Sequence, residues 1–229
     1  MRAPLSVIIP TLNAEQALPA CLGALYAGVS AGILRELIVV DGGSEDQTLA
    51  IADEVGAKII RTTPSRGGQL RQGGELATGE WLLFVHADTV LSENWAEAVE
   101  AKLGQSDKAG WFTLAFDTPG PAGRFVAGWA NLRSRVFGLP YGDQALLISR
   151  RLYGQLGGYD DIPLMEDVAL ARRLGSKRLV RLDAIATTSA EKYRKQGWLR
   201  RGRRNLLTLL RYFLGAKPET LAASYRKGS

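Results

Sequence analysis

Two apolar segments of the sequence each lead to an aspartate. The run at residues 81–85 is followed three residues later by Asp88, and the run at residues 37–40 is followed directly by Asp41. An open α/β sheet binds its ligands at the carboxyl ends of its strands, so a carboxylate in this position suits a metal ion or a polar ligand. The two acids therefore predict one shared site at the edge of a sheet.

Strand-like and helix-like patterns alternate at short intervals through the first half of the chain. This alternation is typical of stacked βαβ units with a mainly parallel sheet, and it predicts an α/β fold. The predicted strands are residues 5–10, 37–41, 58–61 and 81–85, and the predicted helices are residues 14–26, 46–55, 68–77 and 94–103.

The order of elements is less regular after residue 103. Residues 111–116 alternate in polarity with a period of two, which predicts a more exposed strand. Glycines and prolines at residues 119–123 mark a loop. Later patterns predict a helix at 125–136, a strand at 145–149 and a short helix at 166–174.

The C-terminal part, residues 191–229, changes in character. Seven basic residues occur between Lys192 and Arg204, and no acid lies between Glu191 and Glu219. Leucines follow from residue 206 to residue 214. Two interpretations fit equally: an amphipathic helix that lies on an anionic membrane surface, or a helix that packs its leucines on the sheet.

Composition narrows the class of protein. The 229 residues are 46% hydrophobic, enough for one large domain or one domain with an appendage, and the formal charge of +6 favours an anionic partner. Nucleic acid is the weakest such partner, because no recognised binding fold is present and few aromatic residues are interleaved with the basic ones. The sequence shows no signal-peptide pattern and no membrane-spanning run, and its single cysteine, Cys21, lies in an apolar pattern. We therefore expect a cytoplasmic protein. If the basic segment docks on the membrane, we expect the protein at the inner face of the membrane.

Four ordered motifs resemble those of glycosyltransferase family 2 with the GT-A fold. They are PTLNAE at residues 10–15, VDGGSEDQT at 40–48, HAD at 86–88 and MED at 165–167. A narrower resemblance, to the radical-SAM/selenodomain-associated transferase 2 or arsenosugar-biosynthesis-type subgroup, rests on residues 65–69, 83–89, 141–144 and 163–167. The resemblance implies a Rossmann-like sheet flanked by helices, with a nucleotide-sugar-binding and catalytic domain at residues 1–190 and a basic helical extension at 191–229.

The resemblance also implies a nucleotide-diphosphate sugar donor, a divalent metal ion and inversion at the anomeric carbon. Asp88 is the expected ligand of Mg²⁺ or Mn²⁺, because these ions prefer hard oxygen ligands and the phosphates supply others. The residues expected to bind the nucleotide sugar are Pro10, Thr11, Asn13, Glu15, Asp41, Arg66, Gln69, His86, Ala87 and Asp88.

Three of these residues also have a purely structural interpretation. His86 stands where the family usually has an acid, and a strand-end histidine hydrogen-bonded to the backbone is favoured over a metal ligand. Asp41 fits an ordinary Asp-Gly-Gly-Ser turn. Arg66 precedes two glycines and a helix, so it brings a guanidinium and backbone N–H groups toward a diphosphate or is simply a loop arginine.

An inverting transferase needs a base that accepts the proton of the acceptor hydroxyl. The resemblance assigns this role to Asp167, while Glu166 begins the helix or forms hydrogen bonds; a preference for acids at a helix N-terminus accounts for both residues equally. The residues expected on the acceptor side are Tyr141, Asp143, Gln144 and Glu166.

The expected acceptor is a small molecule or a lipid-linked compound, and two other functions are considered. A sugar-phosphate nucleotidyltransferase is disfavoured, because the first strand leads into residues 10–13 without a glycine-rich, arginine-containing loop. A non-catalytic nucleotide-binding or membrane-binding module is disfavoured by the retained carboxylates. Residues 196–200 only loosely match the Gln-x-x-Arg-Trp motif of processive synthases, which predicts a single transfer per encounter.

Overall fold

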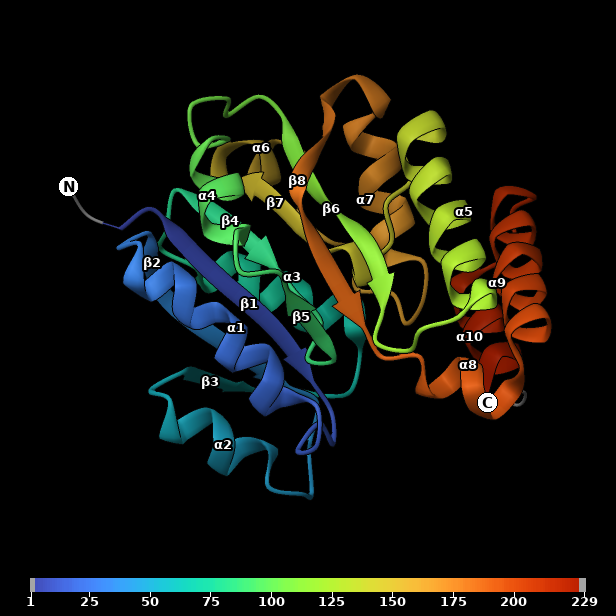
Figure 1. Ribbon diagram of the computed structural model, residues 1–229, viewed down its shortest axis with the longest axis horizontal. Coiled ribbons are helices and arrows are strands. Elements are labelled where there is room, and N and C mark those ends of the chain that lie inside the picture. Colours follow the sequence, from blue (N-terminus) through green and yellow to red (C-terminus); the bar gives the residue numbers. More distant parts are fainter. Residues whose placement is uncertain (1–2, 227–229) are drawn as a thin grey trace.

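The computed structural model describes residues 3–226 and contains one curled, eight-stranded sheet with helices on both faces (Figure 1). The sheet order is β3-β2-β1-β4-β7-β6-β8-β5. The strands are β1 (Leu5–Thr11), β2 (Leu34–Asp41), β3 (Lys58–Arg61), β4 (Trp81–Phe84), β5 (Thr89–Leu91), β6 (Ala109–Phe116), β7 (Leu146–Ser149) and β8 (Leu179–Thr188). The helices are α1 (Leu18–Ser30), α2 (Thr48–Glu54), α3 (Arg66–Leu76), α4 (Trp95–Glu100), α5 (Pro121–Phe137), α6 (Arg150–Gln155), α7 (Glu166–Leu174), α8 (Glu191–Gln196), α9 (Trp198–Phe213) and α10 (Pro218–Arg226).

The first four strands form a fully parallel half of the sheet. β1 pairs in parallel with both β2 and β4, and β2 pairs in parallel with β3. In this register Thr11 lies beside Asp41, and Ile8 lies beside Phe84. The chain therefore leaves β1, β2 and β4 at the same edge of the sheet, as the two strand-end aspartates predict.

Alternating strand residues build a separate core on each face of the sheet. Leu5, Val7 and Ile9 of β1 join the core formed with α1, α2 and α4, whereas Ile8 joins the core formed with α3, α6 and α7. Both faces are covered, so the central strands are apolar nearly throughout. Cys21 lies in the first core at 1% exposure, and burial, with a smaller contribution from Asp88, raises the pKa of its thiol to about 12.

The second half of the sheet is mixed and departs from the sequence expectations. β6 was expected to be exposed, but Trp111 and Phe112 are 2% and 0% exposed because β6 lies between β7 and β8. β8, β5 and α6 were not predicted. The alternating burial of β8 is a strand signal, yet its exposed arginine and aspartate side chains, Arg181 and Asp183, dilute the apolar pattern.

The C-terminal helices pack on the domain through a small apolar cluster. Leu209 of α9 and Leu221 of α10 are buried with Met165 and Val168, which lie at and near the start of α7. Most of the other leucines of α9 remain exposed, among them Leu199, Leu206 and Leu210. No helix within residues 3–226 is both long enough and apolar enough to cross a membrane.

The close contact between α3 and the sheet makes a test of the fold. A Cβ atom at Gly73 would lie 2.4 Å from Cγ2 of Ile8 and 3.0 Å from Cγ2 of Val40. We expect Gly73→Ala to lower the free energy of unfolding by about 1–3 kcal/mol, because α3 must shift away from β1 and β2. Urea denaturation followed by circular dichroism measures this change.

Gly23 provides the matched control. It is an exposed helical glycine in α1, and a Cβ there would meet no atom within 4 Å. Gly23→Ala should raise the free energy of unfolding by about 0.5–1 kcal/mol through helix propensity alone. A Gly73→Ala variant as stable as Gly23→Ala would contradict the packing of α3 on the sheet.

Candidate active site

An open cavity of about 1120 Å³ lies at the carboxyl edge of the parallel strands. The segment that follows β1 lines it, and so do residues of α8, α9 and α10. Most of the predicted site residues line it: Pro10, Thr11, Asn13, Glu15, Arg66, Gln69, His86, Ala87, Asp88, Tyr141, Asp143, Glu166 and Asp167. The two predicted residues that do not line it are Asp41 and Gln144.

Asp41 lies behind the cavity wall and is 0% exposed. Its carboxylate accepts hydrogen bonds from the hydroxyl of Thr11 at 3.0 Å, from the backbone N–H groups of Gly43 and Ser44 at 2.8 Å each, and from the Ser44 hydroxyl. Burial acts to raise the pKa of Asp41, but these hydrogen bonds outweigh burial and lower it. In this structure Asp41 therefore fixes the ends of β1 and β2 from behind the cavity wall, and its expected contact with the nucleotide stays a prediction.

Gln144 is also fully buried and does not line the cavity, and its expected place on the acceptor side stays a prediction. Its side-chain oxygen accepts from the Ser134 hydroxyl and the Tyr141 backbone, and its nitrogen donates to the Asn131 side chain at 3.1 Å and to the Phe112 carbonyl at 3.4 Å. These bonds join α5 to β6 and to the turn at Gly142–Gln144. Gln144 thus positions Tyr141 and Asp143 without facing the cavity.

Gln69 faces the cavity but has its donors engaged. Its side-chain nitrogen donates to the carbonyls of Thr11 at 2.8 Å and Val40 at 2.7 Å, which braces the ends of β1 and β2 from α3. The loop after β1 is held on its other side by Asn13, whose side-chain oxygen accepts from the N–H of Glu45 at 2.9 Å. Glu15 accepts from the N–H of Gln47 at 3.0 Å. The cavity wall is therefore fixed by hydrogen bonds to its neighbours.

Asp88 is the residue best placed to hold a metal ion. It is half-buried, follows β4 and lines the cavity. Within residues 3–226 no group of three or more His, Cys, Asp or Glu side chains is arranged to hold a metal by itself. A single carboxylate facing an open cavity still fits Mg²⁺ or Mn²⁺, because such ions are often held by one or two carboxylates together with substrate phosphates and water.

Arg66 is a basic residue close to the acidic residues of the cavity. It begins α3, is 47% exposed to the cavity, and its Nε lies 3.8 Å from Oε1 of Glu166. Burial acts to lower the pKa of its guanidinium, but the pKa is raised by four carboxylates, those of Glu166, Asp143, Asp167 and Asp88. Carboxylates from three separate parts of the sequence therefore act on one guanidinium.

The backbone at the start of α3 does not offer the expected N–H groups to a ligand. The N–H of Gly67 donates to the carbonyl of Ile162 at 3.3 Å, and the N–H of Gly68 donates to the Ser65 hydroxyl at 3.3 Å. Gly67 is required here, because a Cβ would lie 2.2 Å from the carbonyl oxygen of Asp160. Arg66 thus contributes its side chain to the cavity, and the following glycines allow close packing.

His86 is paired with a side chain and not with the backbone, which corrects the sequence interpretation. Its Nδ1 lies 3.2 Å from Oδ1 of Asp143, and its Nε2 would lie 2.3 Å from a Cβ at position 142, so only glycine fits there. Burial acts to raise the pKa of Asp143, but the hydrogen bond and charge of His86, with Arg66 and Lys192, hold this pKa well below its usual range. Because the ionised Asp143 only accepts, Nδ1 of His86 carries the proton.

Glu166 and Asp167 are adjacent but differ sharply in environment. Glu166 is 2% exposed, its Oε2 has no hydrogen-bond partner, and burial, together with the charge of Asp167, raises its pKa to about 7. Asp167 is half-buried, and its two oxygens accept from the N–H groups of Gly142 at 2.8 Å and Val168 at 2.7 Å. Asp167 is therefore a fixed carboxylate that a ligand can reach, whereas Glu166 is nearly closed off.

Several cavity residues were not predicted from the sequence. They come mainly from the C-terminal helices and include Lys192, Tyr193, Lys195, Gln196, Arg201, Asn205 and Tyr225. Their basic members were recognised as a cluster, but nothing in their spacing connects them with Asp88. Asp46, which accepts from the N–H of Glu15 at 3.0 Å, was also missed, although it lies in the VDGGSEDQT motif.

Comparison with known proteins places this geometry in a family. Residues 6–135 match the family described as Glycosyl transferase family 2, which is more than half of the chain. The chain belongs to glycosyl transferase family 2. The narrower subgroup resemblance is not shown by these matches.

Two curated proteins are similar to part of this chain. The chain is 36% identical over 171 residues to the PGL/p-HBAD biosynthesis glycosyltransferase of Mycobacterium bovis (strain BCG / Pasteur 1173P2), covering 70% of this chain and 65% of that protein. It is 38% identical over 99 residues to dolichyl-phosphate beta-glucosyltransferase of Drosophila melanogaster, covering 37% of this chain and 30% of that protein. The chain thus spans just under two thirds of the mycobacterial family member.

Solved structures confirm the predicted GT-A fold. The crystal structure of S. aureus TarS 1-349 has a TM-score of 0.64 and 18% identity, covering 90% of this chain and 64% of that chain. Glucosyl-3-phosphoglycerate synthase from Mycobacterium tuberculosis, solved in complex with Mn²⁺ and uridine-diphosphate-glucose, has a TM-score of 0.58 and 20% identity, covering 81% of this chain and 69% of that chain.

The raised pKa of Glu166 predicts a pH-dependent stability. Between pH 4.5, the ordinary pKa, and about pH 7, the folded protein holds a proton that the unfolded chain has released. The Glu166 contribution therefore makes the free energy of unfolding fall as pH rises through this window. Glu166→Gln stays neutral, so its stability relative to the wild type should rise from pH 4.5 to pH 7 in urea unfolding curves.

The exposed Glu100, at the end of α4, supplies the control for this measurement. Glu100→Gln should follow the wild-type dependence on pH. Unfolding free energies of Glu166→Gln that run parallel to those of the wild type across the same window would show that Glu166 is ionised at low pH like an ordinary glutamate.

Proposed function

We propose that this protein is a metal-dependent, inverting glycosyltransferase that moves a sugar from a nucleotide-diphosphate sugar to a hydroxyl of a small-molecule or lipid-linked acceptor. The observation that carries the proposal is the convergence of Asp88, Arg66 and Asp167 on one cavity. Its volume of about 1120 Å³ exceeds the roughly 300–1,000 Å³ of a typical ligand pocket, which suits a donor and an acceptor bound together.

The donor half of the proposal rests on the family and on the wall formed by the segment after β1. Structural neighbours were solved with UDP-GlcNAc and with uridine-diphosphate-glucose, which supports a nucleotide sugar as donor. In this chain Pro10 and Thr11 form part of a hydrogen-bonded wall beside Asp88 and Arg66. We assign the nucleotide to this wall and the diphosphate to the region between Asp88 and Arg66.

The leaving diphosphate accumulates negative charge, which the cavity must offset. Asp88 would hold Mg²⁺ or Mn²⁺, and the bound ion would act as a Lewis acid toward the phosphate oxygens. The chain itself supplies the guanidinium of Arg66, which the surrounding carboxylates keep charged, and the nearby Lys192 lines the same cavity. Arg66 can bind a phosphate through two parallel N–H donors, which orients as well as neutralises.

Asp167 is the better candidate for the base. Its oxygens each accept one backbone N–H and are partly exposed to the cavity, so an acceptor hydroxyl can approach them. Glu166 is 2% exposed and lies beside Arg66, so we assign it to positioning that guanidinium. In transfer, the acceptor oxygen forms a bond to the anomeric carbon as its proton passes to Asp167 and the bond to the diphosphate breaks.

The acceptor side is assigned to the wall opposite the nucleotide. Tyr141 and Asp143 lie there, together with Tyr193, Asn205 and Tyr225 from the C-terminal helices. In this division residues 1–190 bind the donor and supply the base, and residues 191–229 complete the acceptor side. The narrower subgroup, suggested by motifs such as residues 65–69, remains part of the proposal.

Two substitutions separate the metal ligand from the base. Asp88→Asn and Asp167→Asn should each lower the rate of sugar transfer on the order of a thousandfold. Only Asp88→Asn should abolish the effect of Mn²⁺ on nucleotide binding, because Asp167 accepts a proton and holds no metal. Transfer is measured by release of the nucleoside diphosphate, and binding by calorimetry with and without Mn²⁺.

Asp107→Asn is the matched control, since Asp107 is exposed and lies outside the cavity. It should retain wild-type transfer and binding. Full activity in Asp167→Asn would remove the assignment of the base, and Mn²⁺-dependent binding retained in Asp88→Asn would remove the assignment of the metal ligand.

The donor itself can be identified by thermal shift. A panel of UDP, GDP and dTDP sugars is tested at increasing concentration with Mn²⁺ and with a chelator. The true donor should raise the melting temperature progressively in the presence of Mn²⁺, since a ligand at a hundred times its Kd stabilises by about 2.7 kcal/mol. A panel in which no nucleotide sugar shifts the melting temperature would contradict a nucleotide-sugar donor of these classes.

A further inference from the structure

Exposed large apolar side chains are concentrated on two neighbouring helices. Of the 17 such residues within residues 3–226, 11 lie on α5, on α9 or at Leu214, directly after α9. They are Phe125, Trp129, Leu132, Val136, Phe137, Leu199, Leu206, Leu207, Leu210, Phe213 and Leu214. We call these 11 residues the α5–α9 face.

On α5 the exposed apolar residues form one continuous ridge. Phe125, Trp129, Leu132 and Val136 follow a spacing of four, three and four, which places them on one side of a helix. They are 72%, 47%, 50% and 56% exposed, respectively. The opposite side of α5 carries Ala127, Ala130 and Ser134, which are buried against the domain.

α9 repeats this arrangement beside α5. Leu199, Leu206, Leu210 and Phe213 lie on one side of the helix and are 82%, 50%, 52% and 45% exposed, respectively. The two helices touch near their starts, where a Cβ at Gly123 would lie 3.0 Å from the ring of Trp198. Figure 1 shows α5 and α9 side by side at the same end of the molecule, away from β1, β2 and β3.

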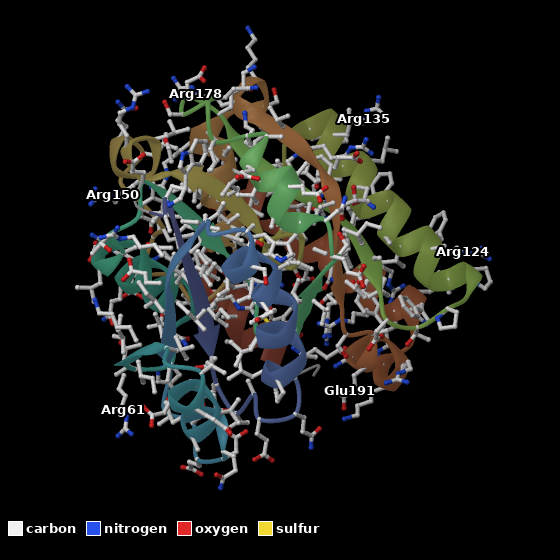
Figure 2. All side chains as sticks on the ribbon, turned by 60° about the vertical axis from the view of Figure 1, so that its left-hand side comes forward. Arg61, Arg124, Arg135, Arg150, Arg178 and Glu191 are labelled. Atoms are coloured by element: carbon white, nitrogen blue, oxygen red, sulfur yellow. The ribbon has the colours of Figure 1, made fainter. Side chains whose placement is uncertain are left out.

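The charges on these helices have one sign. The helices contain no Asp or Glu, and their five exposed arginines are Arg124, Arg135, Arg200, Arg203 and Arg211. Figure 2 shows Arg124 and Arg135 near the two ends of α5, with their charged groups pointing away from the body of the molecule. On a helical projection both lie on the same flank of the apolar ridge, while Arg200 and Arg211 share one flank of the α9 ridge.

We propose that the α5–α9 face binds the surface of an anionic lipid bilayer. Apolar and aromatic side chains enter the boundary between head groups and acyl chains, and the flanking arginines contact anionic head groups. A second copy of this chain suits the face poorly, because a symmetric contact would place the exposed arginines of both copies against each other. The proposal does not rest on the sugar-transfer reaction.

The same helix also reaches the cavity. Arg201, Asn205 and Thr208 lie on the side of α9 away from the exposed leucines and line the cavity wall. α9 is therefore the layer between the α5–α9 face and the site. In a protein bound to a bilayer by this face, α9 would lie between the lipid and the cavity.

Sedimentation with vesicles tests the proposal. The wild type should bind vesicles of phosphatidylcholine mixed with phosphatidylglycerol, and it should bind pure phosphatidylcholine at least about tenfold more weakly. Phe125→Ser/Trp129→Ser removes two exposed aromatic anchors and should lower the partition coefficient on mixed vesicles by on the order of tenfold or more. Salt should weaken the binding of the wild type to mixed vesicles, and the triple variant Arg200→Gln/Arg203→Gln/Arg211→Gln should lose most of this dependence of binding on salt.

Tyr26→Ser is the matched control, because Tyr26 is 70% exposed on α1, outside the α5–α9 face. It should bind as the wild type does. Melting curves check that each variant is folded, and blue-shifted tryptophan emission on mixed vesicles, lost in Trp129→Phe, locates the contact on α5.

Three results would overturn the proposal. One is the absence of sedimentation with mixed vesicles at low salt. Another is binding by folded Phe125→Ser/Trp129→Ser that equals the wild type. The third is a wild-type dimer in sedimentation velocity that becomes monomeric in this variant while neither form binds vesicles, which would assign the face to a second copy.

Discussion

The parallel register of β1, β2 and β4 is the constraint on which the site depends, and one buried carboxylate joins the ends of β1 and β2. Asp41 accepts four hydrogen bonds at the end of β2, one of them from Thr11 at the end of β1. Gln69 donates to the carbonyls of Thr11 and Val40 from the helix behind. An unpaired buried carboxylate would be costly, so the loop that satisfies Asp41 has little freedom to adopt another conformation. The segment after β1, which forms part of the cavity wall, is therefore also held in one conformation.

Several charged side chains lie close together at this edge of the sheet. Four carboxylates raise the pKa of Arg66. The pKa of Asp143 is lowered, mainly by His86, whereas the pKa of Glu166 is raised by burial. Two neighbouring carboxylates would repel each other if both were ionised in a buried position. Burial and the charge of Asp167 both favour the neutral form of Glu166 and raise its pKa to about 7.

The sequence predicts the parallel half of the sheet well because its strands are apolar on both faces and end in acids or turn residues. It predicts that Asp88 and Asp167 approach one cavity through motif resemblance alone, since no local pattern relates residues so far apart. Side-chain direction was not predictable: Asp41 and Gln144 are of the right type and near the site, yet both point into the protein and satisfy backbone groups. The wall made by α8–α10 was missed for a similar reason. Its basic residues were recognised, but whether a cation faces water, lipid or a cavity depends on packing.

The helix α9 shows that packing on the domain and the proposed membrane contact need not exclude each other. A helix has a full circumference, and here Leu209 enters the apolar cluster with α7, Arg201 and Asn205 face the cavity, and Leu206 and Leu210 remain exposed. Packing on the domain therefore uses only one sector and leaves a second apolar sector without a partner. The proposed bilayer contact would remove that sector from water and would so contribute further stabilisation. Because α9 also lines the cavity, a partner bound to the ridge would contact the same helix that forms part of the cavity wall. The proposed anionic bilayer matches the chemistry of both the leucines and the arginines.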